Sequence, residues 1–159
     1  MKKFVTLLLT LFIATCVYAQ SAEVITSILE SEEVTYGQIC YLSAVRQGLV
    51  AEDSSYDDAF GTLVQRGDVS ADVSCSDVIN LQNLSRIYTK IWDACDGGLM
   101  YRITKGSARY SFKLLKADGI LTDKADPMDK VSGFEALNIL SSCMMEYGSD
   151  EECMDMDIE

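Results

Sequence analysis

The chain has 159 residues, 48% of them hydrophobic, and a formal net charge of -12 from 13 basic and 25 acidic side chains. This excess of acid excludes the clustered Lys and Arg of a nucleic-acid interface and disfavours adsorption to anionic membranes. The sequence contains no histidine and no Cys-x-x-Cys pair. We therefore expect no Ser-His or Cys-His nucleophile, no metal centre and no cofactor.

Residues 1–19 have the pattern of a secretory signal peptide. Lys2 and Lys3 precede an apolar stretch over 4–16, and Ala19 ends a small-residue cleavage site. The apolar stretch is too short for a transmembrane helix, and no later stretch is long enough. We therefore expect an exported protein, in the periplasm or on the cell surface, without a transmembrane segment.

An alternative for the same leader is a lipoprotein signal in which Cys16 carries a lipid anchor. Thr15 fits poorly immediately before such a cysteine, so simple secretion is the favoured interpretation. In either case the mature chain, which lacks the 19-residue leader, has the length of one domain with its own core.

Apolar stripes at helical spacing, each ended by glycine or polar residues, predict a mainly helical protein. The segment 99–104 is ambiguous, and we interpret it as a short strand or an extended crossing segment. The last predicted helix follows a loop that contains the only proline. The predicted helices cover 23–31, 36–47, 56–66, 80–95, 112–118 and 134–145, of which 80–95 is the longest.

Three of the predicted helices share one start signal. A β-branched apolar residue precedes Thr, Asn or Ser, and Gln, Asn or Glu follows three residues later. The Thr, Asn or Ser side chain caps the helix by accepting a hydrogen bond from the backbone amide three residues later. The side chain of that later residue can in turn accept a hydrogen bond from the backbone amide of the capping residue. The copies are Thr35 with Gln38, Asn80 with Asn83, and Ser132 with Glu135.

A shift of 52 residues superimposes the second and third of these starts together with the helices before them. The shift aligns Phe60 with Phe112, Leu63 with Leu115, Gly67 with Gly119, and Asn80 with Ser132. The first cap lies 45 residues before the second, a difference that loops accommodate. The sequence therefore predicts three degenerate helix-loop-helix repeats that pack as a single helical domain over 20–148.

The third repeat resembles the S-layer homology family. The relevant segments are Leu114–Ile120, the loop with Asp126-Pro127, and Val131–Leu137. In that family a helix ends in Gly-Ile, a loop holds an aromatic-x-Pro element, and the next helix opens with Ile-Thr-Arg-Ala-Glu. Weaker similarity at 34–42 and 59–87 extends the resemblance over roughly 32–145. It implies a pseudo-threefold helical prism that anchors exported proteins noncovalently to cell-wall glycans.

The chain departs from this family at one informative position. The family's arginine after the cap, which contributes to its anionic-glycan pocket, is Tyr36, Leu81 and Gly133 here. Glu135 alone matches the family's acidic position, and its simplest role is to close a capping box. The resemblance therefore supports the scaffold better than it supports an anionic ligand.

Five cysteines follow the signal peptide. An oxidising compartment predicts at least one disulfide, and the odd number leaves at least one thiol unpaired. Cys95 and Cys143 continue apolar stripes, so a buried, unpaired role is equally supported for these two. The connectivity stays open among Cys40, Cys75, Cys95, Cys143 and Cys153.

The only cluster in which cations and aromatics alternate is a candidate ligand or partner patch. A site for a carboxylate-bearing glycan or for a partner's acidic loop is the functional interpretation. Ion pairs with neighbouring acidic helices are the simpler alternative. The cluster consists of Tyr101, Arg102, Lys105, Arg109 and Tyr110.

The end of the chain, 149–159, is an acidic tail. It carries six acids and no cation, and self-repulsion at this density opposes packing. We expect the tail to be disordered unless Cys153 is bridged to the core.

These features together predict an exported, non-enzymatic cell-envelope protein with a structural or anchoring role, in contact with an envelope glycan or another envelope protein. Two alternatives stay open. One is a secreted, disulfide-stabilised interaction module without wall contact. The other is a glycan hydrolase with a carboxylate pair, drawn for example from Glu30, Glu32, Glu33, Asp57 and Asp58, although so acidic a chain forms such pairs by chance.

Overall fold

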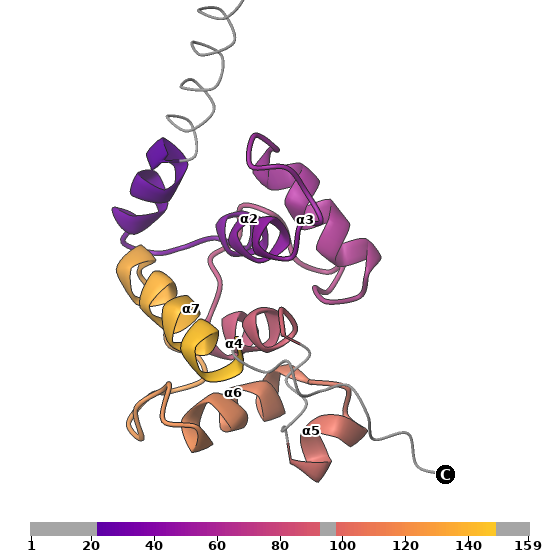
Figure 1. Ribbon diagram of the computed structural model, residues 1–159, viewed down its shortest axis with the longest axis vertical. Coiled ribbons are helices and arrows are strands. Elements are labelled where there is room, and N and C mark those ends of the chain that lie inside the picture. The colour runs from indigo at the N-terminus through magenta and orange to yellow at the C-terminus, as the bar shows by residue number, and fades with distance from the viewer. Residues whose placement is uncertain (1–21, 93–97, 149–159) are drawn as a thin grey trace, which may run out of the picture.

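The computed structural model describes residues 22–92 and 98–148, and within these ranges the chain is a bundle of helices without a sheet (Figure 1). Two isolated β-bridges, Thr35 with Val78 and Asn80 with Lys130, are the only bridge pairing in the described ranges. The predicted mainly helical class is confirmed. The helices are 22–29, α2 (Tyr36–Arg46), α3 (Tyr56–Gln65), α4 (Leu81–Thr89), α5 (Leu99–Ile103), α6 (Ala108–Ala117) and α7 (Gly133–Tyr147).

Some of the sequence predictions concern residues outside these ranges. They are the signal peptide, the alternative lipid anchor at Cys16, the acidic tail 149–159, and the cysteines Cys95 and Cys153. Of the described helices, none has both the length and the apolar character needed to cross a bilayer.

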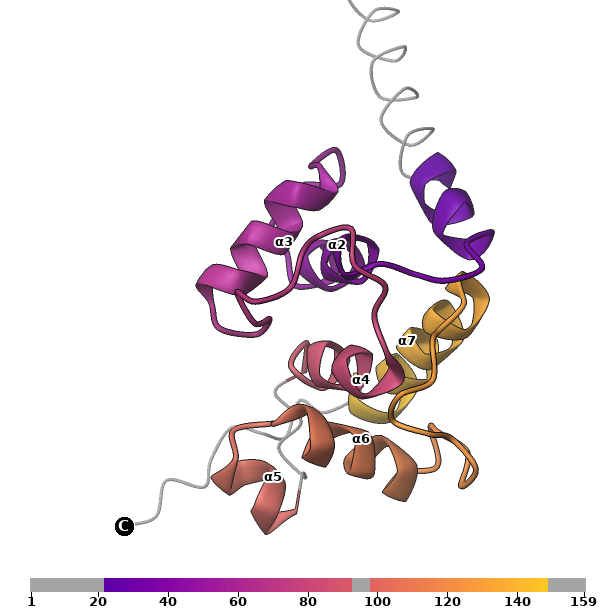
Figure 2. The same cartoon turned by 180° about the vertical axis from the view of Figure 1, so that it is seen from behind.

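The helices pack in pairs around one core. α2 lies against α3, α4 lies against α6, and α7 runs beside α4, as both views show (Figures 1 and 2). The start of α7 meets the end of the helix at 22–29, where the Gly133 amide donates to the Ser31 carbonyl at 2.8 Å. Each pair buries the apolar stripes that the sequence predicts.

The N-terminal turns of α2, α4 and α7 are joined by a repeating pattern of backbone hydrogen bonds. The first amide of each helix donates to the loop that leads into the next cap: Tyr36 N to Asp77 O, Leu81 N to Asp129 O, and Gly133 N to Ser31 O. The second amides of α2 and α4 do the same, from Gly37 to Cys75 O and from Gln82 to Pro127 O. For α2 and α4 the two acceptors lie three and five residues before the next cap. The three repeats are therefore linked cyclically into one domain.

The residues just before the three caps form the centre of this ring. Val34, Ile79 and Val131 are fully buried. The Val34 amide donates to the Val131 carbonyl at 2.9 Å, and the Ile79 amide donates to the Val34 carbonyl at 3.0 Å. β-Branched side chains suit these short extended segments, which explains why the start signal includes one each time.

The glycine stops of the second and third repeats also match. Gly67 and Gly119 adopt φ of +78° and +75°, the left-handed conformation that ends a helix most readily at glycine. After each glycine, two amides return to the carbonyl of Leu63 or of Leu115. The 52-residue register thus extends from the caps back into the preceding helices.

Two expectations about the middle of the chain are wrong. Segment 99–104 is not a strand, because 99–103 is helix α5. A strand needs a neighbouring strand for its amides, and none is present in the described ranges, whereas in α5 Tyr101 N donates to Gly98 O at 2.8 Å within the segment. The helix expected over 80–95 ends at Thr89, because Ile91 N bonds to Tyr88 O and tightens the chain into a turn. α7, with 15 residues, is instead the longest helix from α2 to α7.

Candidate functional site

All three predicted caps form, but only the first closes a full capping box. Gln38 N donates to Thr35 Oγ1 at 3.4 Å, and Thr35 N donates to Gln38 Oε1 at 3.0 Å. Asn80 accepts from the amide three residues later at 2.9 Å, and Ser132 accepts from Glu135 N at 3.3 Å. The role expected for the Glu135 side chain is wrong, because within the described residues its carboxylate does not bond back to the Ser132 amide. This carboxylate is exposed instead.

Glu135 borders a groove between α7 and the loop that follows α6, which we call the α7 groove. Its volume is about 350 Å³. The buried Leu121 and Ile139 are the most deeply buried of its lining side chains. The groove is lined by Ile120, Leu121, Thr122, Ala125, Phe134, Glu135, Asn138, Ile139 and Ser142.

The polar side of the α7 groove is a row of side chains on α7. Glu135, Asn138 and Ser142 are spaced three and four residues apart, so they share one face of the helix. Phe134, just before this row, is 63% exposed. The groove therefore combines an accessible aromatic ring with a carboxylate, an amide and a hydroxyl, and no cation is among its lining residues.

Lys116 holds the opposite wall of the groove in place. Its ammonium group donates to the carbonyl of Asp123 at 2.7 Å and to that of Ala125 at 3.4 Å. The Ala125 amide in turn donates to the Thr122 carbonyl at 3.1 Å. A wall fixed by its own hydrogen bonds loses little conformational entropy when a ligand binds.

A second hollow, of about 460 Å³, lies beside the first cap and is lined in part by Gln38, Tyr56 and Asp57. Its polar and aromatic groups are already engaged. Gln38 closes the capping box and also donates to Ser31 Oγ at 3.1 Å. Tyr56 packs edge-on against Tyr41, with ring centroids 5.5 Å apart. This hollow therefore offers less to a ligand than the α7 groove does.

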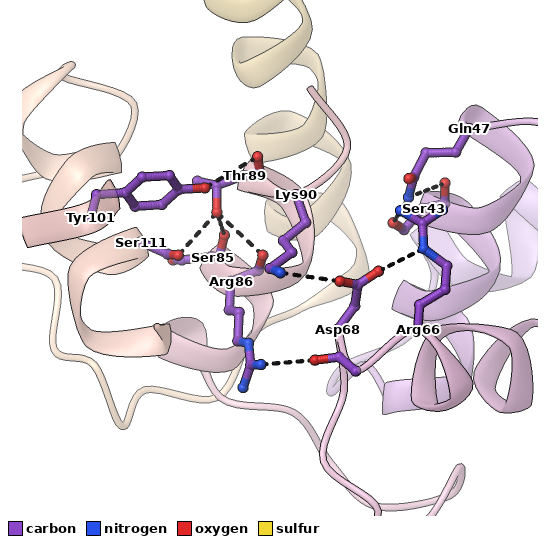
Figure 3. Close-up of polar contacts among 11 residues, drawn as sticks. Ser43, Gln47, Arg66, Asp68, Ser85, Arg86, Thr89, Lys90, Tyr101 and Ser111 are labelled. Atoms are coloured by element: carbon purple, nitrogen blue, oxygen red, sulfur yellow. Dashed lines mark hydrogen bonds and ion pairs between the residues drawn. The ribbon is translucent and has the colours of Figure 1, made fainter. Parts of the chain in front are cut away.

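Asp68, which directly follows Gly67 after α3, is the most buried acidic side chain among the described residues, with 6% of its side chain exposed. It faces Lys90 Nζ at 3.2 Å and Arg66 Nε at 3.1 Å (Figure 3). Its Oδ2 has no aligned hydrogen bond, so the Arg66 contact is ionic only. Beside it, Arg86 donates to the Gly67 carbonyl at 2.9 Å. Because the four charged side chains of this cluster are engaged in joining the end of α3 to α4, we interpret the cluster as structural.

In the structure, the residues of the candidate patch predicted from the sequence separate into a buried or half-buried group and an exposed group. Tyr101 is buried and donates to the Thr89 carbonyl at 3.5 Å, so it anchors α5 on α4 (Figure 3). Tyr110 is half-buried beneath Lys113, whose ammonium lies 5.6 Å from the ring centroid. Arg102, Lys105 and Arg109 are exposed. The simpler alternative, ion pairs with acidic helices, is not observed: the ion pairs among the described residues involve other cations.

The three cysteines in the described ranges are unpaired. Cys40 and Cys143 are buried and Cys75 is half-buried, and none of them forms a disulfide. Burial raises the pKa of Cys40 and of Cys143 to about 12, with a further contribution from nearby acidic groups. Burial, together with Asp57, raises the pKa of Cys75 to about 11. These thiols stay protonated at neutral pH, so none of them is an activated nucleophile.

The candidate carboxylates for a hydrolase are spread over the surface. Glu30, Glu32, Asp57 and Asp58 are exposed, and Glu33 pairs with Lys130 at 2.8 Å. Across the described ranges, no three His, Cys, Asp or Glu side chains converge as they would around a metal ion.

No known protein family, no curated protein and no solved structure matches the chain. The candidate site therefore depends on geometry alone. The α7 groove was missed by the sequence analysis, although one signal pointed to it. Phe134 is out of register with the stripe formed by Ala136, Ile139 and Cys143, and an aromatic residue opposite a buried stripe is exposed.

Proposed function

We propose that this protein is an exported, non-enzymatic cell-envelope protein that binds an envelope glycan in the α7 groove. The observation that carries the proposal is the exposed ring of Phe134 beside Glu135, Asn138 and Ser142. A sugar ring presents C–H groups on its faces and hydroxyls around its edge. An aromatic face can cover the former, while amide, hydroxyl and carboxylate groups can exchange hydrogen bonds with the latter.

The scaffold supports the same proposal through its resemblance to the S-layer homology family. Three capped helices linked cyclically at their first turns are the arrangement expected of a pseudo-threefold prism. The position of the family's glycan-binding arginine is Gly133 in the third repeat, and a Cβ there would overlap the Ile28 carbonyl. With no arginine and no cation lining the groove, we propose a neutral glycan rather than an anionic one.

The alternatives are less well supported by the geometry. A retaining or inverting hydrolase needs two carboxyl groups about 5 to 9.5 Å apart around the scissile bond. Among the described residues, Glu135 is the only acid that lines the groove. A secreted interaction module without wall contact would cover the exposed Phe134 with a protein partner instead of a glycan, and binding to sacculi separates these two cases.

Cosedimentation of the purified mature protein with peptidoglycan sacculi tests the proposal. We expect retention by sacculi, a loss of affinity of at least tenfold in Phe134→Ala and in Asn138→Ala, and no change in Met145→Ala. Met145 is a suitable control because it is an exposed apolar residue of α7 that does not line the groove. Retention that is unchanged in Phe134→Ala would refute the groove as the site, release of muropeptides would indicate the hydrolase, and no retention would favour the interaction module.

A further inference from the structure

One exposed surface of the molecule combines apolar and cationic side chains, and we call it the α5 patch. Leu99, Met100 and Ile103 are 71%, 52% and 63% exposed. Apolar groups this exposed and this close together are typical of interaction sites. The cations beside them have no acidic partner among the described residues. The patch consists of Leu99, Met100, Arg102, Ile103, Lys105 and Arg109.

The α5 patch is held in place from below. Tyr101, on the inner side of α5, is buried and reaches the Thr89 carbonyl of α4. The Gly106 amide donates to the Tyr101 carbonyl at 2.9 Å, and Gly106 takes φ of +68° to pass under the Tyr101 ring. Because α5 is anchored through its one buried side chain, the exposed apolar residues form a fixed surface.

The start of α6 adds positive potential to the same surface. Ser107 occupies the N-cap position but its side chain makes no capping bond, and no acid lies in the first turn. Arg109 lies in that turn instead. A helix N-terminus without an acid favours a negatively charged group nearby, so Arg109 and the helix dipole attract the same kind of partner.

We propose that the C-terminal segment 149–159 of this chain docks on the α5 patch. The segment carries Asp150, Glu151, Glu152, Asp155, Asp157 and Glu159, and between them Met154, Met156 and Ile158. Acids would face Arg102, Lys105 and Arg109, and the alternating apolar residues would cover the exposed side chains of α5. The sequence alone predicts a disordered tail because self-repulsion of its acids opposes packing. Composition does not reveal that a complementary surface exists elsewhere on the chain.

The root of the segment lies close enough to the patch. α7 ends at Tyr147, whose ring centroid is 6.4 Å from that of Trp92. Trp92 follows Thr89 by one turn, and Thr89 accepts the bond from Tyr101. Residues 149–159 in extended form reach at most about 36–40 Å, which is more than enough to cross α5.

Limited proteolysis of the intact mature protein with an endoproteinase that cleaves after glutamate tests this docking. Glu151 and Glu152 offer cleavage sites within the tail, and when docking and release are fast the cleavage rate follows the released population. We expect cleavage there to be at least fivefold faster in Arg102→Glu/Arg109→Glu than in the wild type. The matched control Arg46→Glu/Lys124→Glu has the same charge change at exposed sites elsewhere and should cleave at the wild-type rate.

Salt and concentration separate the remaining cases. In about 0.5 M NaCl the wild type should cleave at the rate of the patch variant, because screening weakens exposed charge pairs. Equal cleavage rates in wild type and patch variant at low salt would overturn the proposal. A protection that disappears on dilution, together with a dimer in solution, would also overturn it, because the tail would then dock on a second copy.

Discussion

Replacing Gly133 by alanine should destabilise the protein, although the same change in a helix normally stabilises it. Gly133 is the first residue of α7, and a Cβ there would overlap the Ile28 carbonyl. The overlapped group is backbone, so the clash is relieved only if α7 moves away from the helix at 22–29. That movement also breaks the bond from the Gly133 amide to the Ser31 carbonyl.

The expected cost is the sum of two contributions. Overpacking costs about 1–3 kcal/mol, and the lost hydrogen bond costs about 0.5–1.5 kcal/mol. We therefore expect the free energy of unfolding to fall by about 1.5–4.5 kcal/mol in Gly133→Ala. The matched control is Gly61→Ala within α3, where an added Cβ meets no atom within 4 Å. There alanine should stabilise by about 0.5–1 kcal/mol.

Urea denaturation followed by far-UV circular dichroism measures both changes under one condition. A loss of stability in Gly133→Ala together with a gain in Gly61→Ala would show that α7 closes the ring of repeats against the helix at 22–29. If Gly133→Ala were as stable as the wild type or more stable, the close approach of α7 to Ile28 would be wrong. The cyclic arrangement of the three repeats would then lose its third contact.

Three further predictions concern the helix caps, the buried thiols and disulfide formation. Alanine at each of the three cap residues should lower the free energy of unfolding by about 0.5–2 kcal/mol in denaturation experiments. Ser107→Ala removes no capping bond and should change it by less than about 0.5 kcal/mol. Unchanged stability at all three caps would contradict the shared start signal. The free energy of unfolding should fall between pH 9 and pH 12. In the fold, Cys40 and Cys143 stay protonated because their pKa is raised to about 12, whereas the thiols of the unfolded chain ionise near pH 9. Urea titrations at pH 8 and pH 10 measure this change, and an unchanged midpoint would contradict it. Protein recovered from a secreted or periplasmic fraction should contain at least one disulfide. It would be visible as a mass change on reduction and alkylation, whereas five thiols alkylated without reduction would refute it.

The parts of the fold that local sequence determines were predicted best. A cap needs only its own side chain and the amide three residues later, and a glycine stop needs only a left-handed residue, so Thr35, Asn80, Ser132, Gly67 and Gly119 were all assigned correctly. The cyclic pairing of the caps is nonlocal, yet the repeat implies it, because equivalent units pack in equivalent ways.

The errors occurred where the outcome depends on distant contacts. The apolar run over 99–103 is too short for periodicity to separate helix from strand. The structure favours α5 because no partner strand is present in the described ranges and because Tyr101 is buried against α4. Glu135 matches a capping box in sequence, but its carboxylate does not return to the cap. Geometry of this kind is set by how α7 packs and is invisible to a spacing rule.

The two proposals concern opposite ends of α6 and can therefore be tested independently. α5 precedes the N-terminus of α6, and the loop after the C-terminus of α6 lies at the other end of that helix (Figures 1 and 2). Residues of this loop line the α7 groove. A helix of ten residues is about 15 Å long, and the two surfaces share no residue.

Substitutions in one surface should accordingly leave the other unchanged. We expect Phe134→Ala to lose sacculus binding while its tail is cleaved at the wild-type rate. We expect Arg102→Glu/Arg109→Glu to release the tail while it binds sacculi like the wild type. If the patch variant alone lost sacculus binding, the glycan contact would lie on the cations of α5, the ligand would be anionic, and the assignment of a neutral glycan to the α7 groove would be wrong.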